Sequence, residues 1–240
     1  MEDNLFNLNN KIYSNNNNNI LLEIVNELSQ IKSDSNENLT ISRLGNIINK
    51  MNYIINISII NKEIKYKDGR YVGQVVNGLK EGKGIRYWND DERYEGDWKN
   101  DKKEGKGIYY YNTEPWKGDR YEGDWRNGKK EGKGIYYYNN GDIYEGEFKN
   151  GKKVGKGIYY YNDGDIYEGD WKNDNMEGKG IYYYKNGDIY EGGWKNDNKE
   201  GKGIYYYNNG NRRMGDYSND KPIGKHITLT KNGEVQTTNY

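Results

Sequence analysis

The side chains that could carry out chemistry are spread evenly along this sequence. Its 240 residues include 37 Asp and Glu, 37 Lys and Arg, one histidine (His226) and no cysteine. Disulfides, cysteine nucleophiles and cysteine-based zinc sites are therefore excluded. A glycosidase needs one particular pair of carboxylates, whereas the acidic residues here recur at matching positions, which favours structural ion pairs. His226 stands where the equivalent positions have Gly, which favours a capping role, so we predict a non-enzyme with no catalytic residue, metal or cofactor.

Lysine is the residue whose spacing could serve a ligand. Lysines recur in register with a 23-residue repeat, and adjacent pairs stand in the predicted turns. The recurrent lysines are Lys83, Lys106, Lys133, Lys156, Lys179, Lys202 and Lys225, and the turn pairs are Lys102, Lys103, Lys129, Lys130, Lys152 and Lys153. The turn lysines would contact anionic lipid if they formed one basic ridge. The alternative is that neighbouring Asp and Glu neutralise them, which the zero net charge favours, and nucleic acid is not an expected partner.

A four-residue insertion, Thr113-Glu114-Pro115-Trp116, interrupts the repeated region. Insertions of this kind are usually tolerated as surface loops. An exposed Trp beside a Pro is also suited to anchoring a protein partner. Pro115 and Trp116 are therefore the candidate partner contact, and stacking of sugars or single-stranded bases on the aromatic rows is a weaker alternative.

The residues that could position these side chains recur every 23 residues, with one interval of 27. Each of seven copies opens with Tyr, continues with Gly two residues later and has Trp or Phe two residues after that; the first and last copies, from Tyr71 and Arg213, are degenerate. The clear copies contain Tyr94, Gly96, Trp98, Tyr121, Gly123, Trp125, Tyr144, Gly146, Phe148, Tyr167, Gly169, Trp171, Tyr190, Gly192 and Trp194. We predict that these positions are structural.

Each copy is predicted to be a β-hairpin, since residues alternate with period two and Asn-Gly marks a turn. With a four-residue loop, Tyr121 would face Tyr136, Gly123 would face Gly134, and Trp125 would face Gly132. On the other side of the sheet, ion pairs would form within each hairpin. These pairs are Asp97 with Lys106, Asp124 with Lys133, Glu147 with Lys156, and Asp170 with Lys179. Rings from the neighbouring hairpin would cover the paired glycines.

The run from Tyr121 to Tyr138, Tyr-Glu-Gly-Asp-Trp-Arg-Asn-Gly-Lys-Lys-Glu-Gly-Lys-Gly-Ile-Tyr-Tyr-Tyr, resembles the MORN repeat (membrane occupation and recognition nexus). The resemblance extends from about Tyr71 to Val235, and the choline-binding repeat fits less well in period and in Gly-Trp order. It implies a mainly β fold, an elongated single-layer antiparallel sheet of about seven hairpins. It also implies a scaffold or adaptor for protein partners, with self-association as a homodimer or contact with anionic phospholipid as the family's associated properties.

Before the repeats, residues 1–19 are predicted to be a disordered Asn-rich tail, and residues 67–240 are predicted to form the array. Residues 20–66 are predicted to contain two helices, the second capped by Thr40, and then a hairpin of strands 54–60 and 63–66. This segment either caps the open sheet edge, which we favour, or forms a helix-turn-helix-like module. No export signal is evident, so we expect a cytoplasmic protein, peripheral on membranes or cytoskeletal structures in the alternative.

Overall fold

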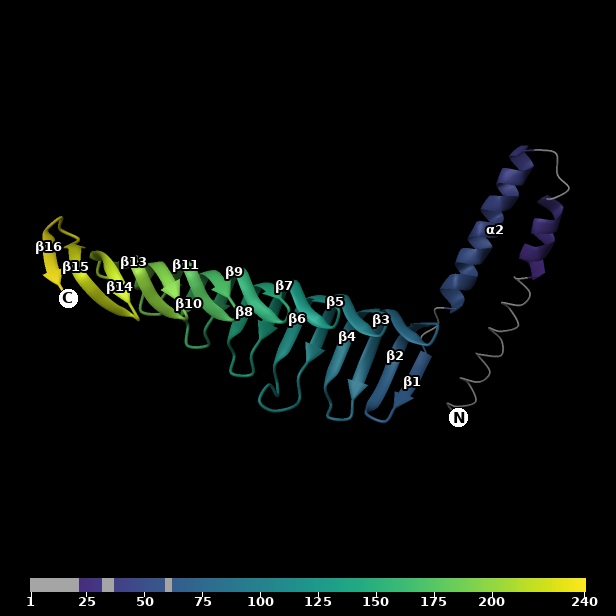
Figure 1. Ribbon diagram of the computed structural model, residues 1–240, viewed down its shortest axis with the longest axis horizontal. Coiled ribbons are helices and arrows are strands. Elements are labelled where there is room, and N and C mark those ends of the chain that lie inside the picture. The colour runs from purple at the N-terminus through teal and green to yellow at the C-terminus, as the bar shows by residue number, and fades with distance from the viewer. Residues whose placement is uncertain (1–21, 32–36, 59–61) are drawn as a thin grey trace. The chain divides into compact units, whose positions relative to one another are not determined.

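The computed structural model describes residues 22–31, 37–58 and 62–240, which form a helical N-terminal unit and a β-sheet unit (Figure 1). The tail predicted at residues 1–19 lies outside the described residues. The first helix comprises residues 22–31 in the part that is described, and α2 is Glu37–Ser58. Within this unit Ile24 and Ile47 are buried, and the Lys50 ammonium lies 2.9 Å from carboxylate oxygens of both Glu23 and Glu27.

Two details predicted for the N-terminal segment are wrong. Thr40 is not an N-cap, because α2 already includes Glu37. Residues 54–58 belong to α2 and not to a strand, since the helical spacing of apolar residues continues through the isoleucine-rich run and outweighs its β propensity. The strand predicted at 63–66 is present within β1, but its hairpin partner is β2.

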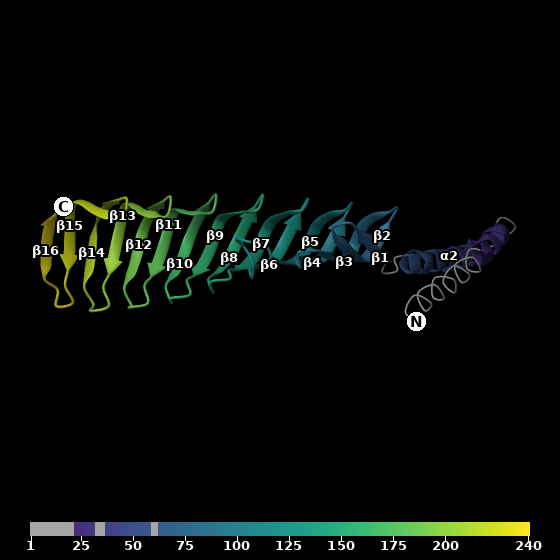
Figure 2. The ribbon, with the colours of Figure 1, turned by 90° about the horizontal axis from the view of Figure 1, so that it is seen from below.

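The sheet of the described chain has sixteen strands in chain order, each bonded to the one before and the one after (Figures 1 and 2). The strands are β1 (Lys62–Tyr66), β2 (Gly69–Val76), β3 (Leu79–Trp88), β4 (Arg93–Lys99), β5 (Lys102–Tyr110), β6 (Arg120–Arg126), β7 (Lys129–Tyr137), β8 (Ile143–Lys149), β9 (Lys152–Tyr160), β10 (Ile166–Lys172), β11 (Asn175–Tyr183), β12 (Ile189–Lys195), β13 (Asn198–Tyr206), β14 (Arg212–Ser218), β15 (Lys221–Leu229) and β16 (Val235–Asn239). The predicted single antiparallel sheet of seven hairpins, β2–β3 to β14–β15, is confirmed, with β1 and β16 as additional edge strands.

The hairpin register agrees with the prediction at the tyrosines and glycines but not at the tryptophan. Tyr121 pairs with Tyr136 and Gly123 with Gly134, whereas Trp125 pairs with Lys130. The turn has only two residues, and the register shifts at a bulge in which Gly132 has a φ of +63°. The predicted four-residue loop is therefore wrong. A two-residue turn followed by a bulge uses as many residues as a four-residue loop would, so both arrangements give the same tyrosine and glycine pairs.

The bulge also changes which charges meet. The Lys106 ammonium lies 2.6 Å from Asp124 of the next hairpin, and Lys83–Asp97 and Lys156–Asp170 repeat this contact. Asp124 interacts with Lys133 of its own hairpin through the backbone, accepting its N–H at 3.0 Å. The predicted ion pairs within hairpins are thus replaced by pairs between hairpins. Because these lysines are about 70% exposed, each pair contributes little to stability.

The opening tyrosines are among the most deeply buried side chains of the sheet, and those from Tyr71 to Tyr190 are 0% exposed. Each ring lies on the glycine pair of its own hairpin, not on that of a neighbour as predicted. A Cβ added to Gly134 would lie 2.5 Å from the Tyr121 hydroxyl oxygen, and that hydroxyl donates to the Asp124 carbonyl at 3.0 Å. Two facing glycines thus let a ring lie against bare backbone.

The tryptophans connect one hairpin to the preceding one. The indole N–H of Trp125 donates to the Gly107 carbonyl at 3.1 Å, and Trp98, Trp171 and Trp194 make the equivalent bond. Each indole also packs edge-on between two opening tyrosines; Trp125 lies 5.3 Å from Tyr94 and 5.2 Å from Tyr121. The structural role predicted for these aromatic positions agrees with this packing.

Phe148 occupies a tryptophan position but has no N–H for the carbonyl of Gly134. We expect Phe148→Trp to raise the free energy of unfolding by about 0.5–1.5 kcal/mol, the usual value of one added hydrogen bond. Trp171→Phe, its matched opposite, should lower it by a similar amount. Urea unfolding followed by far-UV circular dichroism measures both, and a less stable Phe148→Trp protein would contradict the assigned role of the indole.

Candidate functional site

The sheet face that bears the opening tyrosines, called here the tyrosine face, carries two further tyrosine rows. The second strands of the five hairpins from β4–β5 to β12–β13 contribute one row, called here the nearly buried row, which is buried at Tyr109 and Tyr136 and half-buried beyond them. The residue two positions later contributes a half-buried outer row. The nearly buried row is Tyr109, Tyr136, Tyr159, Tyr182 and Tyr205, and the outer row is Tyr111, Tyr138, Tyr161, Tyr184 and Tyr207. Neighbouring rings of the two rows lie within van der Waals reach; for example, the Tyr138 and Tyr159 centroids are 5.6 Å apart.

Carboxylates in the loops between hairpins hold the nearly buried row in place. Tyr136 donates to Asp119 at 2.6 Å, and the same carboxylate accepts the N–H of Asn139 at 2.8 Å. Asp142 does the same for Tyr159 and Asn162. The sequence prediction missed these loop carboxylates, although an acidic residue or Asn two positions before each opening residue from Glu92 to Asn211 is visible in the repeat.

Five lysines at one position of the hairpins, the inner lysines, extend over the tyrosine face: Lys80, Lys103, Lys130, Lys153 and Lys199. The Lys103 ammonium lies 4.1 Å from the Tyr109 centroid and 4.2 Å from that of Trp125. The Lys130 ammonium lies 4.3 Å from the Tyr136 centroid. Aromatic faces stabilise a nearby ammonium, so these cations are held in the surface of the tyrosine face.

The six turn lysines predicted as one lipid-contacting ridge lie on two faces. Lys103, Lys130 and Lys153 are inner lysines, whereas the outer lysines, Lys102, Lys129 and Lys152, are exposed on the opposite face. Adjacent residues of a strand point to opposite faces, so a Lys-Lys pair cannot contribute both members to one ridge. The prediction of a single ridge is therefore wrong, and only the outer lysines are placed to protrude from the sheet.

The insertion forms a compact loop between β5 and β6. Its ends keep the closing hydrogen bonds of the other inter-hairpin loops, with the Tyr111 N–H donating to the Asp119 carbonyl at 3.0 Å. Pro115 is exposed, and Trp116 is 53% exposed. The loop thus presents the indole to solvent, as a partner contact requires, and its role stays a prediction.

The repeat of Tyr, Gly and Trp positions on this face identifies the family. The sequence matches the MORN repeat at residues 71–93, 94–113, 121–143, 144–166, 167–189 and 190–212. The chain belongs to the MORN-repeat family. The structure of streptogramin B lyase aligns with 76% of this chain and 69% of its own, at 14% identity and a TM-score of 0.18, too low to bear on fold or function. No curated protein matches the chain.

The seventh hairpin lies beyond the matched MORN repeats and replaces its opening tyrosine by Arg213. His226 of the facing strand fills the resulting space, with its ring over Gly215 and its Nε2 2.8 Å from the Asp216 carbonyl. The ring is 0% exposed and packs between Tyr217 and Tyr240. His226 therefore has the structural role that the sequence predicts.

Two kinds of site are absent from the described residues. No three His, Asp or Glu side chains of residues 22–31, 37–58 and 62–240 come together as metal ligands would. Neither described helix is both long and apolar enough to span a membrane.

Burial disfavours the charged form of the inner lysines in the central MORN repeats. Removal from water lowers the pKa of Lys103, Lys130 and Lys153 to about 8, and the neighbouring Lys130 ammonium contributes to the lowering at Lys103. Above this pKa the folded chain binds fewer protons than the unfolded chain, whose lysines titrate near 10.5. The free energy of unfolding should therefore rise with pH across this window.

We expect the urea midpoint of the wild-type protein to rise between about pH 7.5 and about pH 9, below the range in which most unfolded tyrosines ionise. Replacing Lys103 and Lys130 by Met should flatten this rise, because it removes two of the three lysines whose pKa is lowered to about 8. Met176 occupies the same position of the repeat and is 7% exposed, so the site accepts this side chain. An unchanged slope in the double variant would contradict the lowered pKa values.

Proposed function

We propose that this chain is a non-enzymatic scaffold that binds a protein partner through the tyrosine face. The observation that supports it most directly is the outer row of half-buried tyrosines. Among the described residues, no hydrogen-bond partner is present for the hydroxyls of Tyr111, Tyr138, Tyr161, Tyr184 and Tyr207. Tyrosines that combine a fixed apolar ring with a free polar tip are enriched in protein interfaces.

The rigidity of the array supports the same proposal. The rings below the outer row are fixed by loop carboxylates and by the backbone, so little side-chain entropy is lost when a partner binds. Trp116 is a second candidate contact on the insertion loop. Self-association as a homodimer is included in the proposal, because β1 and β16 each have one unpaired edge within the sheet.

A second function, contact with an anionic membrane, is favoured by a separate observation on the opposite face. Three cross-strand pairs of like charge stand there in successive hairpins, all exposed: Lys99 with Lys102, Arg126 with Lys129, and Lys149 with Lys152. Like charges directly opposite each other are destabilising in a sheet, and an anionic surface would relieve the repulsion. Under this alternative the protein is cytoplasmic and peripheral on membranes.

Replacing Tyr138 and Tyr161 by Thr should abolish partner binding, because both belong to the outer row; Thr230 holds the equivalent position in the last hairpin. The matched control replaces Tyr137 and Tyr160, their neighbours on the opposite face. Affinity capture from the producing cells, with bound proteins quantified by mass spectrometry, compares the two. Equal loss in both variants, or in neither, would contradict the tyrosine face as the docking surface, and Trp116→Ala in parallel tests the loop.

Vesicle sedimentation separates the membrane alternative from the scaffold. With vesicles containing phosphatidylserine at low salt, the wild type should pellet and a protein with Glu at Lys102, Lys129 and Lys152 should not, whereas the Tyr138 and Tyr161 variant should pellet normally. High salt should release the wild type, since screening weakens the attraction. A wild-type protein that stays in the supernatant at low salt excludes this function.

A further inference from the structure

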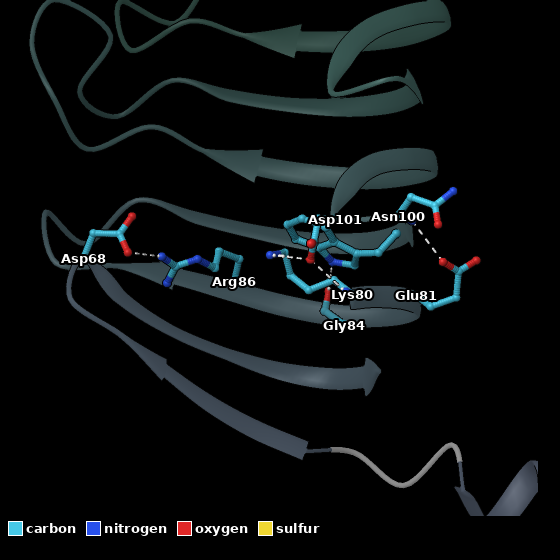
Figure 3. A network of polar contacts seen from close by, with 8 residues as sticks. Asp68, Lys80, Glu81, Gly84, Arg86, Asn100 and Asp101 are labelled. Atoms are coloured by element: carbon cyan, nitrogen blue, oxygen red, sulfur yellow. Dashed lines mark hydrogen bonds and ion pairs between the residues drawn. The ribbon is translucent and has the colours of Figure 1, made fainter. Parts of the chain in front are cut away.

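Each inner lysine stands beside a turn of the next hairpin, and in some hairpins that turn supplies a carboxylate. Asp101 accepts the backbone N–H of Lys80 at 2.8 Å and lies 2.9 Å from its ammonium (Figure 3). Asp174 and Asp220 accept the backbone N–H of Lys153 and Lys199 in the same way, each at 2.9 Å. Asp197 makes the same bond to the N–H of Met176 at 2.7 Å. The array therefore has a standard place for a carboxylate at the backbone N–H of this strand position, and at Lys80 that carboxylate also pairs with the ammonium.

At Lys103 and Lys130 that place has no side chain, because the equivalent turn residues are Gly128 and Gly151. The turn itself is unchanged. The Gly128 N–H donates to the Lys103 carbonyl at 2.8 Å and the Gly151 N–H to the Lys130 carbonyl at 2.9 Å, as Asp101 does to Lys80 at 3.1 Å. In the part of the chain that the structure describes, neither ammonium forms an ion pair. Two successive hairpins thus present a fixed cation without its carboxylate.

We infer that Lys103 and Lys130 bind two carboxylates, three residues apart, of an extended acidic segment in the protein partner. This inference rests on the proposed function, because it requires the tyrosine face to be the docking surface. Each incoming carboxylate would take the position that Asp101 holds beside Lys80, next to both an ammonium and a turn. Bonds of this charge-assisted kind are stronger than neutral ones.

The spacing of the two cations specifies the conformation of the segment. Lys103 and Lys130 are one hairpin apart, which is two strand spacings or about 9.6 Å. A polyproline II helix rises about 3.1 Å per residue with three residues per turn, so residues i and i+3 lie on one side about 9.3 Å apart. Aromatic surfaces are the usual docking sites of such segments. A segment with Glu or Asp at every third residue therefore matches both the lysines and the tyrosine row beside them.

The burial of these cations favours a protein segment over a lipid surface. Lys103 and Lys130 are half-buried among rings, while the outer lysines of the opposite face are exposed. A flat bilayer would contact protruding residues first. Lipid headgroups are accordingly an alternative that the experiment has to separate.

The chain offers a matched pair of variants for the test. Replacing Gly128 and Gly151 by Asp supplies the missing carboxylates from within, and replacing them by Asn gives the same shape without charge. A Cβ at either position meets no atom within 4 Å, and the φ angles of +81° and +87° are close to the +77° of Asp174. Both double variants should therefore fold, which circular dichroism and urea unfolding verify.

The probe is a twelve-residue peptide of repeated Glu-Pro-Pro, and its binding to the full-length protein is measured by isothermal titration calorimetry. We expect the Asp variant to bind about tenfold more weakly than the wild type, and the Asn variant to bind as the wild type does. Peptides of repeated Gln-Pro-Pro and Glu-Gly-Gly should also bind about tenfold more weakly, the first for lack of charge and the second for lack of a preformed helix.

Equal peptide binding by the Asp variant and the wild type would overturn the inference, as would equal binding of the Gln peptide. Loss of vesicle sedimentation in the Asp variant, without any peptide binding to the wild type, would also overturn it and assign the site to lipid headgroups. Affinity capture distinguishes this failure from that of the proposed function. If the Tyr138 and Tyr161 variant loses the partner but the Asp variant keeps it, only the inference about Lys103 and Lys130 is wrong. If both variants keep the partner, both the inference and the proposed function are wrong.

Discussion

The contact between an opening tyrosine and the glycine pair of its own hairpin is the interaction on which the rest of this structure depends. A single-layer sheet has no second layer to cover its side chains, so large residues must be buried against the backbone itself. At Tyr121 this requires hydrogen atoms in place of side chains at both Gly123 and Gly134, since a Cβ on either would lie 2.5–2.6 Å from the Tyr121 hydroxyl oxygen. The facing glycine pairs are thus a consequence of having no second layer.

Once that ring is fixed, the neighbouring contacts follow. The indole of Trp125 needs a flat, buried edge to pack against and a carbonyl to bond, and Tyr94 and Gly107 of the preceding hairpin provide them. Asp119 then links the second strand of its own hairpin to the following loop. Every such contact joins nearest neighbours along the chain, so stability is the sum of local terms, as in other repeat arrays.

The sequence predicts this framework well because its physical rules are periodic. Alternation and the Asn-Gly turns predict the hairpins, and facing glycines predict the pairing of Gly123 with Gly134. The bulge at Gly132 is not visible in the alternation, and missing it misplaced the partners of Trp125 and Asp124. Alternation alone, applied to Lys102 and Lys103, would have placed them on different faces. Residues 54–58 have both helical spacing of apolar residues and high β propensity, and a single sequence does not decide which of the two determines their secondary structure.

The repeat also indicates which positions can determine partner specificity, because it identifies the positions that are needed for the structure. Positions that hold the array together are nearly the same in each matched repeat, because the tyrosine contact allows few alternatives there, and they alone therefore cannot specify a partner. Specificity must come from positions at which one hairpin differs from the next without loss of structure. Gly128 and Gly151 meet that condition, since their turns keep the backbone bonds of Asp101 and lose only a carboxylate. The insertion that ends in Trp116 lies between β5 and β6, directly before the hairpin that contains Gly128, so these departures from the repeat fall within one stretch, β5 to β9.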